Sequence, residues 1–337
     1  MNQDNPKPLI ECLSDGTPVR SEEIRFRPEL LTTCSSCGRK NPPDKAKCLY
    51  CGGELSVTPE FADKVAPELR KLEDWESGYN IIIGPADTGS AQCVNEIARL
   101  LEMEPADIGA GLETGQPLPI ARLVSLRDAE RSAERITELG IPAKIVADAD
   151  LMPDRSPTRL RSIEFGMDEL ILVDFNRSTR TAIASSDLVL IVTGVINETK
   201  TDILEKKRRG SVKVLDESET FSDEAVIDIY SRTDPVGSRV LLTGFDFSCL
   251  GDDRGLIAAE NLRSLVIALH EFAPESRIVN SYSAVRDAIA GVWEIDRRRD
   301  SRGMQRSGFG KFEFGNTASS SNLKQFNKFS RLQWHLL

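Results

Sequence analysis

Two pairs of cysteines constrain this chain more than any other feature. Cys34 and Cys37 form one Cys-x-x-Cys pair, Cys48 and Cys51 form a second, and a glycine follows each pair. Four thiolates at this spacing can surround a tetrahedral zinc ion, and each glycine can adopt the positive φ that turns backbone amides toward the sulfur atoms. Four protein ligands leave no open coordination position, so we expect structural Zn2+ and no chemistry at the ion.

The residues around these cysteines resemble two families of small zinc domains. The pattern from Cys34 to Leu55 resembles the short zinc ribbons of prokaryotic multidomain proteins, which are usually appended interaction modules. The spacing Cys-x-x-Cys-x-x-x-Asn-x6-Cys-x-x-Cys is also similar to that of Ran-binding-type zinc fingers, some of which bind single-stranded RNA. A core this small needs its metal, and metal binding contributes on the order of 10 kcal/mol or more to folding in such sites.

Length and composition indicate further domains in an ordinary cytoplasmic protein. The chain has 337 residues, 40% hydrophobic and 28% charged. It contains no apolar run long enough to span a membrane and no export signal at its start, so we expect it in the cytoplasm, where thiols stay reduced. Two histidines and three isolated cysteines, Cys12, Cys93 and Cys249, offer little for catalytic chemistry.

The pattern of the chain divides it into six segments that make a multidomain α+β protein. They are an N-terminal extension (1–29), the zinc ribbon (30–56), a linker helix (57–77), a small α/β sandwich (78–153), a β domain (157–275), and a C-terminal helix with a basic and aromatic tail (280–337).

The linker segment (57–77) has the pattern of a helix, and the segment 78–153 alternates strands and helices. A helix is predicted from Thr58 to Asp74, and residues 78–153 follow the order β-α-α-β-α-β. Through Ile97–Met103, Ile108–Leu112 and the helix from Asp128 to Gly140, the sandwich resembles the C-terminal domain of the ribosomal stalk protein, a fold shared with the protease adaptor that binds N-terminal degrons. The resemblance implies an open-faced sandwich that binds proteins.

One loop in the sandwich has the glycine spacing of a nucleotide-binding loop. Gly84 and Gly89 match a P-loop, but Ser90 and Ala91 stand where the motif needs lysine followed by serine or threonine. The sequence therefore argues against nucleotide binding, and this loop is better explained as a helix cap.

Residues 157–275 show closely spaced strand patterns and then one amphipathic helix over 256–272. Seven strands are predicted, beginning at residues 160, 169, 179, 188, 212, 225 and 238. The arrangement resembles a pleckstrin-homology-like (PH-like) domain, in which one helix closes a seven-stranded barrel. The resemblance implies binding of phosphoinositides or protein segments.

A basic run in this segment is a candidate anion-binding loop. It comprises Lys206, Lys207, Arg208 and Arg209. The acidic run from Asp216 to Glu224 follows the basic run closely and could neutralise its charge within the chain. A self-paired charge patch is therefore the alternative to binding of an anion or a membrane surface. We do not expect a membrane surface to be the partner.

The C-terminal segment is predicted as a helix from Ser281 to about Arg299, a strand over 308–315, a break at Ser319–Ser321 and an apolar end. Residues 296–337 hold nine basic residues against three acids in a chain of net charge −10. Basic residues interleaved with aromatics are typical of a nucleic-acid surface, although apolar chain ends also dock on their own protein. The candidate residues for an RNA or protein partner are Arg297, Arg298, Arg299, Arg302, Arg306, Lys311, Phe312, Lys324, Phe326, Lys328, Phe329, Arg331 and Trp334.

Three classes of function remain open from the sequence. A non-enzymatic adaptor that binds a protein partner comes first, because each module resembles a binding module. An RNA- or ribosome-associated protein that uses the tail comes second. An enzyme, such as a hydrolase, comes third, because Asp148, Asp150 and Asp154 share one predicted loop but have no partnered base or open metal site in the pattern.

Overall fold

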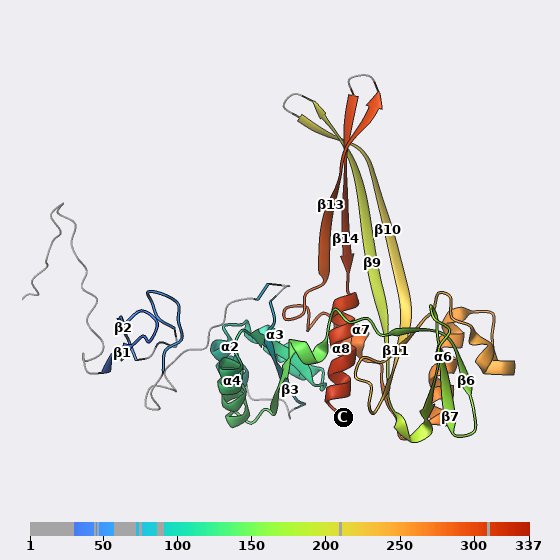
Figure 1. Cartoon of the computed structure of the whole chain (residues 1–337), viewed down its shortest axis with the longest axis horizontal. Coiled ribbons are helices and arrows are strands. Elements are labelled where there is room, and N and C mark those ends of the chain that lie inside the picture. The colour runs from blue at the N-terminus through green and yellow to red at the C-terminus, as the bar shows by residue number, and fades with distance from the viewer. Residues whose placement is uncertain are drawn as a thin grey trace, which may run out of the picture. The chain divides into compact units, whose positions relative to one another are not determined.

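The computed structural model describes two units of the chain (Figure 1), Met1–Pro67 and Glu68–Leu337. The described residues are 30–43, 45, 47–56, 72–73, 76–85, 91–208, 211–308 and 311–337, with the backbone alone for 203–208, 211–217, 302, 304–308 and 311–315. The predicted extension 1–29, most of the linker helix, the loop with Gly89 and the residue Arg209 lie outside them. Within the described ranges, no helix is long and apolar enough to cross a membrane.

The N-terminal unit is built on a minimal hairpin. Strands β1 (Thr32–Thr33) and β2 (Lys40–Asn41) pair antiparallel, and a bridge between Lys47 and Glu54 closes the second half. Its buried apolar cluster comprises Cys34, Cys48 and Leu55. With so few buried side chains among the described residues, this unit depends on its cysteines for stability.

The α/β sandwich has the predicted β-α-α-β-α-β order. Its three strands pair antiparallel in the order β4-β3-β5. Ser125 caps α4 by accepting a hydrogen bond from the Asp128 amide, as its spacing predicts, and Gly140 ends the helix with φ 89°. The elements are β3 (Tyr79–Ile83), α2 (Ala91–Leu101), α3 (Pro105–Glu113), β4 (Leu118–Leu123), α4 (Leu126–Glu138), β5 (Ala143–Ala147) and a short α5 (Asp148–Leu151).

The second large element is an open sheet of nine described strands. Its order is β13-β14-β9-β10-β11-β6-β7-β8, and β12 pairs with the base of β9. The strands are β6 (Thr158–Phe165), β7 (Glu169–Asp174), β8 (Arg180–Ala184), β9 (Leu188–Arg208), β10 (Ser211–Ser231), β11 (Ser238–Leu241), β12 (Arg277–Val279), β13 (Asp296–Gly308) and β14 (Lys311–Ser321).

The prediction of a closed PH-like barrel over 157–275 is wrong. In the described residues, β8 and β13 form the two edges of the sheet and do not pair with each other. The predicted strands at 212–215 and 225–230 are parts of one strand, β10, and the run 188–193 is only the start of β9. These two strands of 21 residues each continue past the body of the sheet, and β14 and β13 add to them instead of a barrel closing.

Helices cover both faces of the sheet at the base of β9 and β10. Because side chains alternate along a strand, each of these strands contributes to two separate cores. The helix predicted over 256–272 is α6 (Ala258–Phe272), and it covers one face of the open sheet instead of closing a barrel. The core under α6 includes Ile191, Ile227, Leu265 and Leu269. The core under α8 (Leu323–His335) includes Val192, Val226, Phe326 and Phe329, together with Ile82 and Val146 of the sandwich.

The predicted helix from Ser281 to Arg299 is also wrong. Only α7 (Tyr282–Val285) is helical, and Asp296 already begins β13. The apolar residues Val285, Ile289 and Trp293 are buried as their spacing suggests, because successive turns place them in the α8 core without a continuous helix. The serines at 319–321 do not break the next strand, since they pair within β14.

Candidate functional site

The four predicted zinc ligands form one cluster. The Sγ atoms of Cys34, Cys37, Cys48 and Cys51 all lie within 4.8 Å of one another, with Cys34 and Cys51 3.6 Å apart and Cys37 and Cys48 3.5 Å apart. Sulfur atoms bound to one tetrahedral zinc ion at about 2.3 Å are about 3.8 Å from each other, so the cluster has the size that the ion requires. Four cysteines in this arrangement can bind a metal such as zinc.

Two matching turns hold the cysteine pairs. The amide of Gly38 donates to the Cys34 carbonyl and that of Gly52 donates to the Cys48 carbonyl, both at 2.9 Å. These glycines have φ of 70° and 72°, a conformation that costs glycine little. The glycine after each pair therefore has the structural role that the sequence predicts.

Asn41 orients one of the sulfur atoms and is fully buried. Its Nδ2 donates to Cys48 Sγ at 3.4 Å and to the Arg39 carbonyl at 2.9 Å, and its Oδ1 accepts from the Leu49 amide at 2.8 Å. Such contacts around a metal site fix the ligand and hold negative charge on it. The sequence identifies Asn41 only through the zinc-finger resemblance, and its hydrogen bonds require the folded unit.

The electrostatics of the cluster favour thiolates that share a cation. Burial raises the pKa of Cys48, but hydrogen bonds from the amides of Tyr50 and Cys51 and from neighbouring side chains lower it to about 6. The Arg39 amide lowers the pKa of Cys37, but burial and the nearby sulfurs raise it to about 12. Four thiols this close cannot all ionise until a metal ion compensates their charge.

The remaining predicted site residues separate into two groups. The group on α8 is turned into the protein: Phe326 and Phe329 are fully buried, and Arg331 donates to the carbonyls of Leu151, Met152 and Arg155. Trp334 donates to the Ser231 carbonyl at 3.0 Å. These residues stabilise the fold, as the alternative of self-docking predicts, and they do not form an exposed surface.

The other group lies on the β13–β14 hairpin. Arg297, Arg298 and Arg299 are exposed on β13, while Arg302, Arg306, Lys311 and Phe312 belong to the part whose backbone alone is described. Figure 1 shows β9, β10, β13 and β14 rising together from the body as a four-stranded ribbon. We use the name ribbon for residues 197–223 and 296–321.

The basic run at 206–208 is at the end of this ribbon and not in a loop. Lys206 pairs with Lys213, and Arg208 pairs with Ser211 next to the turn. The acidic residues from Asp216 to Glu224 pair with residues 196–204, nearer the body, so the register does not set them opposite the basic run. The pairing of β14 with β9 reaches Phe314 opposite Glu205, which brings the second basic hairpin to the same end.

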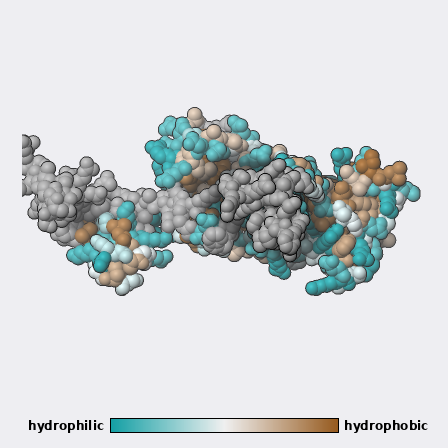
Figure 2. Space-filling model, turned by 90° about the horizontal axis from the view of Figure 1, so that it is seen from above, coloured by the Kyte–Doolittle hydropathy of each residue, from teal (hydrophilic) through white to brown (hydrophobic). Residues whose placement is uncertain are grey.

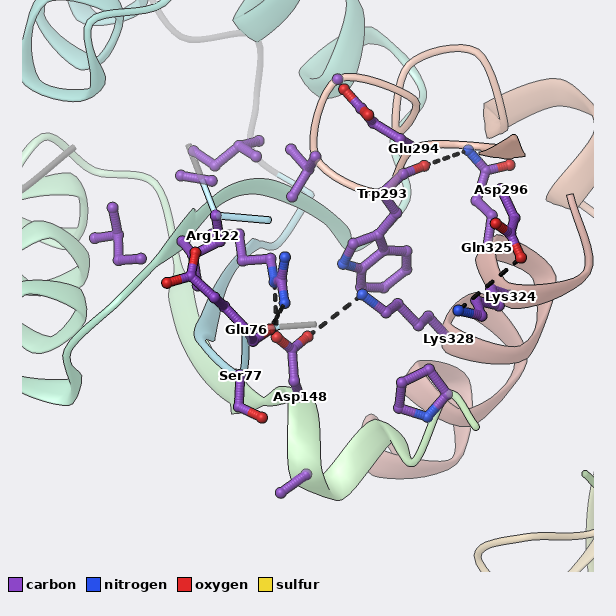
Figure 3. Close-up of a pocket in the computed structure, with 18 of the residues that line it drawn as sticks. Glu76, Ser77, Arg122, Asp148, Trp293, Glu294, Asp296, Lys324, Gln325 and Lys328 are labelled. Atoms are coloured by element: carbon purple, nitrogen blue, oxygen red, sulfur yellow. Dashed lines mark hydrogen bonds and ion pairs between the residues drawn. The ribbon is translucent and has the colours of Figure 1, made fainter. Parts of the chain in front are cut away.

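A cavity of about 700 Å³ lies between the sandwich and α8 (Figure 3). At its wall, Asp148 begins α5 and accepts from Arg122 at 2.7 Å, from Asn80 at 3.1 Å and from the Gly78 amide at 2.9 Å. Lys328 Nζ lies 3.5 Å from the same carboxylate. Burial raises the pKa of Asp148, but these cations and the Asn80 amide lower it below its usual value. A carboxylate with four donors and a lowered pKa is a fixed anion that joins elements of the fold.

The other acids of the predicted loop do not assemble with Asp148. Asp150 and Asp154 are exposed, and Asp154 lies 3.7 Å from Lys324. A second buried polar group, Asp228, accepts two hydrogen bonds from Arg239 at 2.6 and 2.8 Å and one from Ser330. In both cases the polar groups satisfy one another inside the fold, which is typical of structural networks.

In Figure 2, brown apolar colour appears among hydrophilic residues at the right-hand end, where Figure 1 has α6. On and just before α6, Leu256 is fully exposed, and Ile257 and Ile267 are 55% and 59% exposed. Exposed apolar side chains in one region are typical of contacts with other proteins.

Comparison with known proteins adds no identity to these sites. The chain matches no protein-family model, no curated protein and no solved structure.

Proposed function

We propose that this protein is a non-enzymatic adaptor that holds a structural zinc ion and binds an anionic partner at the end of its ribbon. The zinc assignment rests on four sulfur ligands at tetrahedral spacing and on Asn41, which donates to one of them. An ion with four protein ligands stabilises the N-terminal unit and leaves no position for a substrate.

One observation supports the partner surface above all. Two basic segments about 90 residues apart in sequence reach the same end of the ribbon through the pairing of β9 with β14. Residues 206–213 and 302–312 together contain eight lysines and arginines, against the two neighbouring acids Glu205 and Glu313, in a chain whose net charge is −10. A cluster of positive charge on an acidic protein attracts and orients an anionic partner.

A protein partner is the first candidate for this surface. The exposed apolar residues beside α6, Leu256, Ile257 and Ile267, provide a second area for protein contact. An adaptor needs two surfaces to connect two molecules. The end of the ribbon would supply one, and the exposed residues Leu256, Ile257 and Ile267 would supply the other.

RNA is the second candidate, and the composition of the β13–β14 hairpin favours it. Phe312 and Phe314 alternate with Lys311 and Glu313 near the turn, and Arg306 pairs with Phe312 in the register. Aromatic and arginine residues together bind bases by stacking while lysines bind phosphates. Binding of this kind weakens steeply as salt rises.

The test is purification of the tagged full-length chain at low salt, with and without nuclease, followed by identification of bound protein and RNA. A ribbon-end variant replaces five basic residues by serine: Lys206, Lys207, Arg208, Arg306 and Lys311. Its matched control replaces five exposed basic residues elsewhere in the C-terminal unit: Arg99, Arg127, Lys144, Arg177 and Arg263.

An adaptor retains a specific protein through nuclease treatment and loses it in the ribbon-end variant only. Recovery of RNA that disappears with nuclease and with the same variant supports the second candidate. A partner that both variants lose equally, or no partner in any sample, contradicts the proposed surface.

A further inference from the structure

We propose that one face of the ribbon packs against the same face of a second copy of this chain. The two ribbons lie face to face and point in the same direction. The proposal rests on the register of the four strands and is independent of the partner proposed above. The face is the one that continues the α6 side of the sheet, and we call it the pairing face.

The register aligns residues of the four strands in rows across the pairing face. Arg299 on β13 pairs with Ala318, Ala318 pairs with Thr201, and Thr201 pairs with Glu219 on β10. Each row thus begins at one edge of the ribbon and ends at the other. This row has a cation at one edge, an anion at the opposite edge and small residues between them.

The neighbouring row also begins with an arginine on β13, but it ends with an aromatic ring on β10. Arg297 pairs with Ser320, Ser320 with Thr199, and Thr199 with Phe221. Phe221 is 70% exposed, an unusual state for a phenylalanine in a strand. Figure 1 shows β9, β10, β13 and β14 continuing beyond the helices that cover the sheet at its base.

Among the described residues, the charges of these rows have no ion-pair partner within one chain. Strands are about 4.8 Å apart, so the two ends of a four-strand row are separated by about 14 Å, too far for an ion pair. Among the described residues no ion pair involves Arg297, Arg299 or Glu219. On the opposite face, by contrast, Lys200 lies 3.9 Å from Asp202 and Arg298 lies 3.1 Å from Asp296.

A two-fold axis parallel to the strands gives the arginine of each row a favourable contact in the other copy. Such an axis sets β13 of one copy against β10 of the other at the same height along the ribbon. Arg299 then faces Glu219 of the other copy, and Arg297 faces the ring of Phe221, an arrangement that favours a cation–π contact. The alternative axis, perpendicular to the strands, sets the arginines of β13 against each other and is unfavourable.

The size and pattern of the face also suit a second copy. Eight pairs join β14 to β9, so the four-stranded part of the face covers roughly 500 Å² and two copies bury about 1,000 Å², the lower limit for a specific interface. A nucleic acid or an anionic membrane fits this face less well, because the exposed Glu219 would repel it.

The test is the oligomeric state of the full-length chain by sedimentation velocity over a range of concentrations. Glu219→Arg and Arg299→Glu each place like charges in both contacts of the dimer, so each variant alone should weaken dimer formation by roughly tenfold or more. An equimolar mixture of the two variants restores opposite charges in both contacts and should recover the dimer. The control is the pair Arg298→Glu and Thr220→Arg, next to these positions but on the opposite face.

The recovery in the mixture separates a broken contact from a misfolded variant, since two misfolded proteins do not rescue each other. The proposal is overturned by a wild-type chain that stays monomeric at every concentration, by a dimer that both single variants keep, or by a mixture that remains monomeric. It is also overturned if the control variants dissociate the dimer as strongly as Glu219→Arg.

Discussion

The indole Nε1 of Trp293 donates a hydrogen bond of 2.8 Å to Oδ1 of Asn80, and both side chains are buried. The two residues are 213 positions apart in the sequence. Through the same amide, Asn80 also donates to Asp148, so one side chain joins the sandwich, the cavity wall and the turn before β13.

Replacing Asn80 by alanine should lower the free energy of unfolding by about 1–3 kcal/mol, because it leaves the Trp293 N–H buried without an acceptor. The measurement is urea unfolding followed by tryptophan fluorescence. Gln92→Ala, which removes an exposed hydrogen bond to Glu96, is the control and should change stability little. Equal effects of the two substitutions would contradict the importance of the buried contact.

Asp148→Asn should destabilise the fold at neutral pH by about 3 kcal/mol, because Arg122 and Lys328 lose their buried counter-charge. The folded-state pKa of Asp148 lies below its unfolded value, so its contribution is present above about pH 4 and is lost as the pH falls through the folded pKa. The variant should therefore lose stability less steeply than the wild type below about pH 4. Thermal melts from pH 2 to 7 measure this, with the exposed Asp150→Asn as control; parallel curves for wild type and Asp148→Asn would disprove it.

Gly194→Ala should destabilise the α8 core by about 1–3 kcal/mol, because a Cβ at residue 194 would lie 2.4 Å from the Phe326 ring. The matched control is Gly109→Ala in α3, where the added methyl meets no atom within 4 Å and should stabilise the helix slightly. Adding Phe326→Leu to Gly194→Ala should recover part of the loss. Denaturant midpoints give the comparison, and no difference between the two glycine variants would refute the close approach.

Removal of zinc should unfold the N-terminal unit and leave the C-terminal unit folded, because the described residues of the first unit bury only a small apolar cluster. Metal analysis of the purified chain should give one zinc ion per molecule, and Cys48→Ser should lose most of it. Cys249→Ser, outside the cluster, serves as control. Loss of α-helical circular dichroism upon chelation would show that the C-terminal unit also needs the ion.

Local patterns in the sequence predicted local structure well. The cysteine spacing identified the four-cysteine cluster, and the apolar periods identified the three strands and three helices of the sandwich, because each of these features depends on residues close in sequence. The burial of Val285, Ile289 and Trp293 was also predicted, although the helix assigned to them was not.

Long-range pairing was the part that the sequence could not supply. Whether β10 turns back into a barrel or continues beside β9 depends on β14, which lies about 100 residues further along the chain. Long-range packing also decides which basic residues of the C-terminal segment are exposed. The basic residues of 297–312 and those of α8 have the same composition, and only the packing of Phe326 and Phe329 shows that α8 is interior while the hairpin is exposed.

The covering of the β9–β10 base by α8 has a consequence for synthesis of the protein. Val192 and Val226 emerge from a ribosome at least 100 residues before Phe326 and Phe329, the side chains that shield them. During that interval one face of two long strands has no helix on it, and exposed strands of this kind readily pair with other chains. We expect nascent chains to need protection by a chaperone until α8 has been made, and substitutions that slow its docking to reduce yield in cells before they reduce the stability of the finished molecule.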